Sequence, residues 1–280
     1  MASLVSNGFR EMLDGPEEQI DLAAAALCIA RCEYPGLDIN EYLRRLDDLA
    51  TDVRSRCTQQ PSPENLLRAI NNYLFGELRF SGNNDEYYDP RNSFLNEVLD
   101  RRLGIPITLS IVYLEVGWRL RLPLAGVSFP GHFLVKLEVD AGDIVLDPYA
   151  GGASLDENDL QERLTDLNPS GRHHSTDITV FLERASHREI LHRLLRNLKA
   201  IYLREKEDEK ALCMMEHMLC VRPGDVRELR DRGLAFARIG CFRAACDDLG
   251  RYLNEYPDAS DADEVRVRLI ESRQSASRLH

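Results

Sequence analysis

The chain has no cysteine between Cys57 and Cys213, although it contains seven cysteines among its 280 residues. The central stretch therefore has no thiol that could serve as a nucleophile or a metal ligand. The cysteines that are present fall mainly in apolar helical patterns and lack the dense spacing of a disulfide scaffold. Their odd number and their spacing argue against a small secreted fold held together by disulfides.

Long apolar runs are also missing. No segment approaches the length of a membrane-spanning helix, and the amino terminus lacks the basic region and apolar run of a targeting signal. Basic residues are few: 35 lysines and arginines against 47 aspartates and glutamates give a net charge of -12. Such a balance disfavours nucleic acid and anionic membranes as partners, because both bind basic surfaces. We expect a cytoplasmic protein that binds neither nucleic acid nor membrane.

The sequence offers no complete metal site. Cys28 and Cys32 are four residues apart and would share one face of a helix, but no His or Cys pair completes a tetrahedral set of ligands. His173 and His174 lie in a polar loop without a carboxylate at helical spacing, which is typical of solvated residues. We therefore expect no metal and no cofactor.

The first third of the chain has helical signals, and 280 residues are enough for two domains. A first helix is expected after Pro16, where apolar residues repeat on one face. Asp38, followed by Glu41, resembles a capping box for a second helix. Ser62 before Pro63 predicts the start of a third. The loop that follows, SGNNDEYYDPRNS, is rich in turn formers and carries Tyr87 and Tyr88, which could line a pocket or pack against the helices.

The centre of the chain combines a helix and a hairpin. The helix expected from Pro106 is apolar on all sides, which indicates burial. After His132 the side chains alternate with the period of a strand, DAGD at 140–143 predicts a turn, and a second strand runs to Tyr149. With the turn centred on the Ala-Gly pair, Asp147 shares a face with His132 but lies four residues out of register, roughly 13 Å away. This pattern predicts either a bulge or no contact between the two side chains.

The last third contains a repeat of 34 residues. The matched pairs are Leu195 and Leu229, Tyr202 and Phe236, Ala211 and Ala245, Met215 and Leu249, and Pro223 and Pro257. This period resembles the tetratricopeptide repeat, TPR, a pair of helices that stacks on its neighbours. Gly233 fits the pattern, whereas Lys199 replaces the glycine in the first copy. We predict two repeats and a final capping helix.

The order of helix, histidine strand and aspartate strand is that of a papain-like or transglutaminase-like active site. Near the helix start, where a cysteine would stand, the best positional substitute is Thr108, with Ser110 second. A hydroxyl two residues after Pro106 is also typical of helix-start capping. His132 fits a cleft or a hydrogen-bonded core position, and Asp147 fits an orienting acid or a turn former before proline.

Several segments together resemble a bacterial family named after the SirB regulator, which joins a transglutaminase-like domain to carboxy-terminal TPR helices. They are EEQIDLAAAALCIARCEYPGLD at 17–38, YYDPRNSFLNEVLDRRLGIPITLSIVY at 87–113, GVSFPGHFLVK at 126–136 and LDPYAGG at 146–152. The resemblance implies an α+β fold: a papain-like core with amino-terminal helices and an antiparallel sheet in residues 1–175, then an all-α TPR-like region in residues 187–280. It also implies a regulatory role. His132 and Asp147 match the family's His and Asp, and Thr108 stands where catalytic relatives have cysteine.

Three functional hypotheses follow. The first is a non-catalytic transglutaminase-like protein that binds a peptide or small ligand in the inherited cleft and a protein partner through its TPR helices. The second is a hydrolase or acyltransferase in which His132, oriented by Asp147, activates a hydroxyl or water in place of cysteine. The third is a scaffold in which the first domain only supports the repeats.

Overall fold

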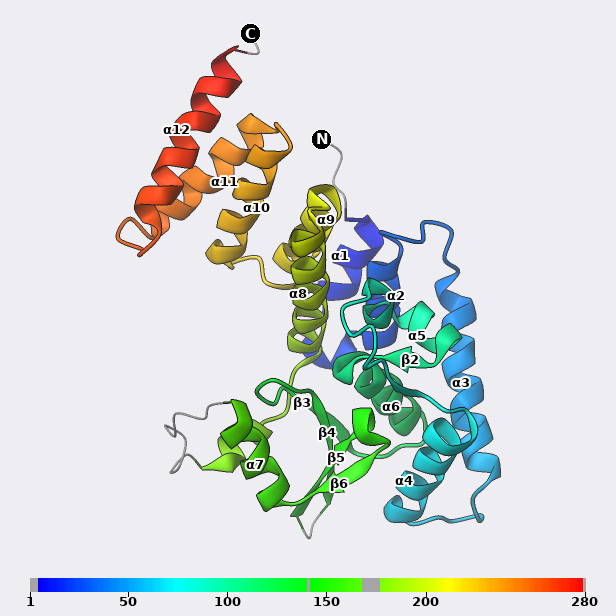
Figure 1. Cartoon of the computed structure of the whole chain (residues 1–280). Helices are drawn as coiled ribbons and strands as arrows, with labels where there is room; N and C mark the ends of the chain where they lie inside the picture. The colour runs from blue at the N-terminus through cyan, green and yellow to red at the C-terminus, as the bar shows by residue number, and fades with distance from the viewer. Residues whose placement is uncertain (1–4, 140–141, 168–176, 279–280) are drawn as a thin grey trace. The chain divides into compact units, whose positions relative to one another are not determined.

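The computed structural model describes residues 5–139, 142–167 and 177–278, and it divides into two compact units (Figure 1). One unit is Glu17–Leu194; the other combines Met1–Pro16 with Leu195–His280. The division falls inside helix α8, His187–Glu205, so this helix begins in one unit and ends in the other. The domain limits 1–175 and 187–280 remain a prediction.

The amino-terminal helices begin at polar caps. α1 comes first and was not predicted, because seven residues give too short an apolar pattern to detect. The predicted caps Asp38 and Ser62 each accept main-chain N–H groups of the first turn that follows. The first predicted helix starts later than expected, behind a cap formed by Asp21. The bounds are α1 Asn7–Leu13, α2 Leu22–Ala30, α3 Ile39–Ser55 and α4 Pro63–Asn71, with a π-helix at Asn72–Glu77.

Helix α6 (Pro106–Arg119) forms the centre of the first unit and is buried from Pro106 to Gly117. It packs against α3 and α4 and against strands β3 and β4. At Gly117 a Cβ atom would lie 2.2 Å from the Leu124 side chain, so the helix approaches the sheet closely there. α5 (Leu95–Arg101) precedes it, between the short parallel strands β1 (Ser81–Gly82) and β2 (Leu103–Gly104).

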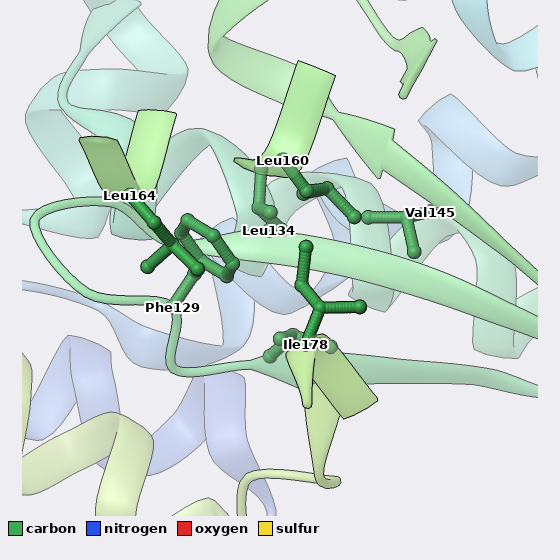
Figure 2. Close-up of a cluster of buried hydrophobic side chains, with 7 residues drawn as sticks. Phe129, Leu134, Val145, Leu160, Leu164 and Ile178 are labelled. Carbon is green, nitrogen blue, oxygen red and sulfur yellow. The ribbon is translucent and has the colours of Figure 1, made fainter. Parts of the chain in front are cut away.

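The main sheet is antiparallel, in the order β3-β4-β5-β6. Its strands are β3 Leu124–Val127, β4 Leu134–Val139, β5 Gly142–Asp147 and β6 Ala153–Leu155. The face away from α6 is covered by α7 (Glu157–Leu167) and a short 3-10 helix, Ile178–Leu182. Figure 2 shows the cluster between these layers: Phe129, Leu134, Val145, Leu160, Leu164 and Ile178.

The register of the hairpin corrects the sequence prediction. Val139 pairs with Gly142 and Val135 with Leu146, so the pairing is shifted by two residues from the one expected. Of the predicted DAGD turn, residues 140–141 lie outside the described residues, whereas Gly142, which was expected in the centre of the turn, is the first residue of β5. The shift places Asp147 two residues out of register with His132 instead of four, a diagonal separation that long side chains can bridge. No bulge is needed.

The carboxy-terminal helices confirm two repeats and a capping helix. They are α8, α9 (Asp208–Val221), α10 (Val226–Arg238), α11 (Phe242–Glu255) and α12 (Ala262–Arg278). The helical residues of the 34-residue pattern are all buried. α10 packs on α9 and α11, and α11 on α12. His173 and His174, which the sequence analysis assigned to a polar loop, lie outside the described residues.

At Gly233, α10 and α11 approach one another closely. A Cβ atom at this position would lie 2.8 Å from Leu249 Cδ2 and 3.1 Å from Asp248 Cβ. We expect Gly233→Ala to lower the free energy of unfolding in urea by roughly 1–3 kcal/mol through overpacking. Gly250→Ala on α11 is the control, because no atom lies within 4 Å of its added Cβ. Helix propensity should make that variant neutral or more stable. Equal effects of both substitutions would contradict the close approach at Gly233.

Candidate functional site

His132 and Asp147 are hydrogen-bonded to one another. His132 lies two residues before β4, Asp147 is the last residue of β5, and His132 Nε2 is 2.9 Å from Asp147 Oδ1. The imidazole keeps 18% of its side-chain surface exposed, whereas the carboxylate keeps 2%. A buried carboxylate thus orients a histidine that remains partly exposed.

Asp147 is bonded from four directions. Its Oδ1 also accepts the main-chain N–H groups of Tyr149 at 3.0 Å and Ala150 at 3.3 Å, so it caps the turn that follows β5. Its Oδ2 accepts a hydrogen bond of 2.8 Å from Nη2 of Arg163, a residue of α7. Burial raises the pKa of Asp147, but the hydrogen bonds and charges of His132 and Arg163 outweigh burial and hold the pKa below its usual value. Both sequence interpretations of Asp147, orienting acid and turn former, describe the same side chain.

The tautomer of His132 follows from its partner. An ionised carboxylate only accepts hydrogen bonds, so Nε2 of His132 is assigned the proton and a neutral ring carries its lone pair on Nδ1. Tyr149 lies edge-on to the imidazole, with ring centroids 5.8 Å apart. Its hydroxyl donates to Asn84 Oδ1 at 2.7 Å, and its ring packs so tightly on Gly82 that a Cβ there would lie 2.3 Å away. Nδ1 is therefore the atom that could accept a proton from a bound group.

Asn71 is hydrogen-bonded to the turn that follows Asp147. Its Nδ2 donates to Gly152 O at 2.9 Å, and its Oδ1 accepts the Tyr113 hydroxyl at 2.9 Å. The Gly152 N–H in turn donates to Asp147 O at 2.8 Å. Sequence reasoning missed Asn71, Arg163 and Tyr149. The π-helix directly after Asn71 is a rare element that often marks functional sites, but it leaves no signal in sequence.

Thr108 is fully buried, and its hydroxyl bonds to main-chain atoms. Oγ1 accepts the N–H of Ile105 at 3.0 Å and lies 2.7 Å from Asn92 O and 3.1 Å from Ile105 O, so its single proton has acceptors within the protein. Ser110 is also buried, with its Oγ 3.4 Å from Phe133 O. The geometry at Thr108 is that of a cap at the start of α6.

Asn92 connects this cap to the tyrosine loop. Its side chain donates to Glu86 O at 2.7 Å and accepts a hydrogen bond from Asn83 Nδ2 at 3.1 Å. Its main-chain carbonyl accepts a hydrogen bond from the Thr108 hydroxyl. Tyr87 and Tyr88 form an edge-to-face pair on this loop and stay 39% and 59% exposed. The start of α6 and the exposed aromatic pair are thus fixed by one buried asparagine.

Among the described helices, none combines the length and apolar character needed to cross a bilayer. The family model of the transglutaminase-like superfamily matches residues 40–196, and a tetratricopeptide repeat model matches residues 198–270. No solved structure matches the chain.

Curated bacterial proteins match almost end to end. A UPF0162 protein of Xylella fastidiosa (strain Temecula1) is 43% identical over 255 residues, 91% of each chain. The UPF0162 protein YchA of Escherichia coli K12 is 31% identical over 240 residues, and Protein SirB1 of Salmonella typhimurium is 29% identical over 240 residues; each alignment covers 85% of this chain and 87% of the relative. The chain therefore belongs to the transglutaminase-like superfamily and, within it, to the UPF0162 family that includes SirB1.

Proposed function

We propose that this protein is a non-catalytic transglutaminase-like protein that binds a peptide or small ligand at the exposed edge of His132 and a protein partner through its TPR helices. Its regulatory role would be exerted through this binding. The observation that carries the proposal is the state of Thr108: the hydroxyl at the nucleophile position is buried and caps a helix.

Catalysis by Thr108 would need three changes at once. The hydroxyl would have to give up its main-chain partners, become accessible, and lose its proton to a base, although a hydroxyl ionises far less readily than a thiol. In the non-catalytic protein none of these occurs. The His132–Asp147 pair persists because Asp147 caps the turn after β5 and anchors α7 through Arg163.

The TPR-like helices supply the second part of the proposal. Stacked helix pairs of this type present extended surfaces for protein partners. Exposed apolar residues lie on the final helix, Val267 and Ile270. These features support partner binding by the repeats, with the partner itself unspecified.

A second candidate function is supported by the His132–Asp147 hydrogen bond. A neutral imidazole held through Nε2 has Nδ1 available as a general base toward a water molecule. In that case the protein would be a hydrolase or acyltransferase with a water or hydroxyl nucleophile, and the exposed edge of His132 would face its substrate.

An activity-based probe separates the two. We expect a fluorophosphonate, which labels activated hydroxyls, to leave Thr108 and Ser110 unmodified by peptide mass spectrometry, because both are buried. We also expect hydrolysis of p-nitrophenyl esters to be the same in wild type and His132→Gln, at the background rate. A serine hydrolase serves as the positive control for the probe. Labelling of Thr108 or Ser110, or ester turnover that His132→Gln removes, would replace the binding proposal by the enzyme.

A further inference from the structure

A surface hollow of about 720 Å³ is lined by residues of the carboxy-terminal half of α3 and of the end of α6. Arg54, Arg119 and Arg121 line it, together with the hydroxyl residues Thr51 and Ser55. All of these residues belong to the Glu17–Leu194 unit, and the lining of the hollow does not include His132 or Asp147. The volume is within the range of small-molecule sites, roughly 300–1,000 Å³.

The hollow is basic although the protein is acidic. Three guanidinium groups line it against one carboxylate, Asp47, whereas the whole chain carries a net charge of -12. Arg119 uses Nε for Asp47 at 2.6 Å and Nη1 for Glu115. Among the described residues, the Arg54 side chain donates only to a neutral carbonyl, Gln59 O, at 2.8 Å. Within that part of the chain Arg54 has no carboxylate partner, and the lining of the hollow carries an excess of positive charge.

Of the three arginines, Arg121 has the fewest interactions among the described residues. In the described part of the chain it has neither a hydrogen bond from its side chain nor an ion pair, and it is exposed. Its backbone is left-handed, with φ at 63°, a conformation that favours glycine at the end of a helix. Arg79 has the same backbone conformation at φ 60°, so the conformation does not by itself require a ligand. What distinguishes Arg121 is its place beside two further guanidinium groups.

The helix end opposes this charge only weakly. The carboxy terminus of α6 carries the negative end of its dipole, about half an elementary charge. Three of its last carbonyls are capped, since Leu120 donates to Val116 O, Arg121 to Trp118 O and Leu122 to Gly117 O at 2.9–3.2 Å. Those carbonyls are thus already hydrogen-bonded, and the charges of Arg54 and Arg121 together exceed the partial negative charge of the helix end.

We propose that this hollow binds a small molecule that carries phosphate groups. Guanidinium forks match phosphate oxygens with paired hydrogen bonds. Arg119 is already bonded to two carboxylates, but Arg54 and Arg121 have no carboxylate partner among the described residues, and two such cations suit a group with two or more negative charges. This site is separate from the proposed function at His132 and stands or falls independently of it.

The test is calorimetric titration of the full-length protein with inorganic pyrophosphate at low ionic strength. We expect saturable binding with one site, about tenfold weaker in Arg121→Gln, since each charged hydrogen-bonded contact contributes on that scale. The double variant Arg54→Gln/Arg121→Gln should lose binding. Arg79→Gln is the matched control, with the same charge change and the same backbone conformation outside the hollow, and it should bind like wild type.

Three results would overturn the proposal. The first is no heat of binding by wild type at millimolar pyrophosphate. The second is an equal loss of affinity in Arg79→Gln and Arg121→Gln, which would indicate nonspecific screening of charge. The third is tight binding of citrate without binding of pyrophosphate, which would assign the hollow to carboxylates. Circular dichroism of each variant should match wild type, because the substituted side chains are exposed.

Discussion

Replacing Lys199 by methionine is expected to lower the free energy of unfolding by about 3–5 kcal/mol, the usual loss when one partner of a buried ion pair is removed. The Lys199 ammonium group on α8 donates to two carboxylates of α10. The acceptors are Glu228 Oε1 at 2.8 Å, Glu228 Oε2 at 2.7 Å and Asp231 Oδ2 at 2.8 Å. Lys199 and Glu228 are 9% and 4% exposed. Without the ammonium group, the Glu228 carboxylate stays buried without its cation.

The pH dependence of this loss identifies its cause. Burial raises the pKa of Glu228, and the charge and hydrogen bonds of Lys199 make this increase smaller. In Lys199→Met the native pKa of Glu228 rises further above its unfolded value, so the native state binds a proton that the unfolded state releases. The loss should therefore be larger at pH 8 than at pH 5, measured by urea unfolding.

Two variants serve as controls for Lys199. Lys206→Met, at an exposed position in the turn directly after α8, should change stability by less than about 0.5 kcal/mol. Lys199→Met/Glu228→Met should recover most of the stability, because apolar residues often replace a buried ion pair without penalty. If the double variant is as unstable as the single one, the loss comes from packing and not from the stranded carboxylate.

The second large effect is a change in the free energy of unfolding between pH 6.5 and pH 4, and it depends on His217. Burial lowers the pKa of this histidine to about 4, from an ordinary value of 6.5. Its Nδ1 bonds to Cys213 O at 2.8 Å, and its ring lies edge-on to Phe9 at 4.7 Å. His217 is therefore neutral in the native protein at neutral pH.

The sign follows from proton uptake. Between pH 6.5 and about 4 the unfolded state binds a proton at His217 that the native state excludes, so the free energy of unfolding decreases as the pH falls through this window. The decrease attributable to His217 is roughly 3 kcal/mol, from about 1.36 kcal/mol per pKa unit. Above pH 6.5 its contribution is complete.

Urea unfolding at a series of pH values measures this slope. His217→Asn keeps a side-chain N–H donor for Cys213 O but does not titrate in the window, so its curve should be flatter than that of wild type between pH 6.5 and 4. His187→Asn is the matched control, because His187 Nδ1 bonds to a main-chain oxygen, Ile20 O, at 2.8 Å. An unchanged slope in His217→Asn would refute the assignment.

Local signals predicted much of the fold. Asp38, Ser62 and Pro106 mark helix starts because a cap acts on neighbouring main-chain groups, within a few residues of the sequence. The 34-residue repeat predicted the helix pairs for a similar reason, since each buried position recurs in the next copy. These features depend on neighbours along the chain.

Long-range packing was the limit of prediction. The hairpin register could not be fixed from DAGD alone, because a shift of two residues keeps every side chain on its face and leaves the alternation unchanged. In the sequence, Lys199 is only a position that departs from the repeat pattern. The contact of its side chain with Glu228 and Asp231 depends on where α10 packs, which the sequence does not reveal. The candidate site shows the same limit: His132 and Asp147 were found from their order, whereas Arg163 and Asn71 come from ordinary helices distant in sequence.

The four-way bonding of Asp147 has an evolutionary consequence. A side chain that caps a turn, anchors α7 through Arg163 and holds His132 is needed for folding whether or not the protein has a reaction to perform. If this lineage has lost its nucleophile, as we propose, selection for folding alone would be enough to retain Asp147 and the histidine bonded to it. The presence of a His132–Asp147 pair is therefore not by itself evidence of catalytic activity.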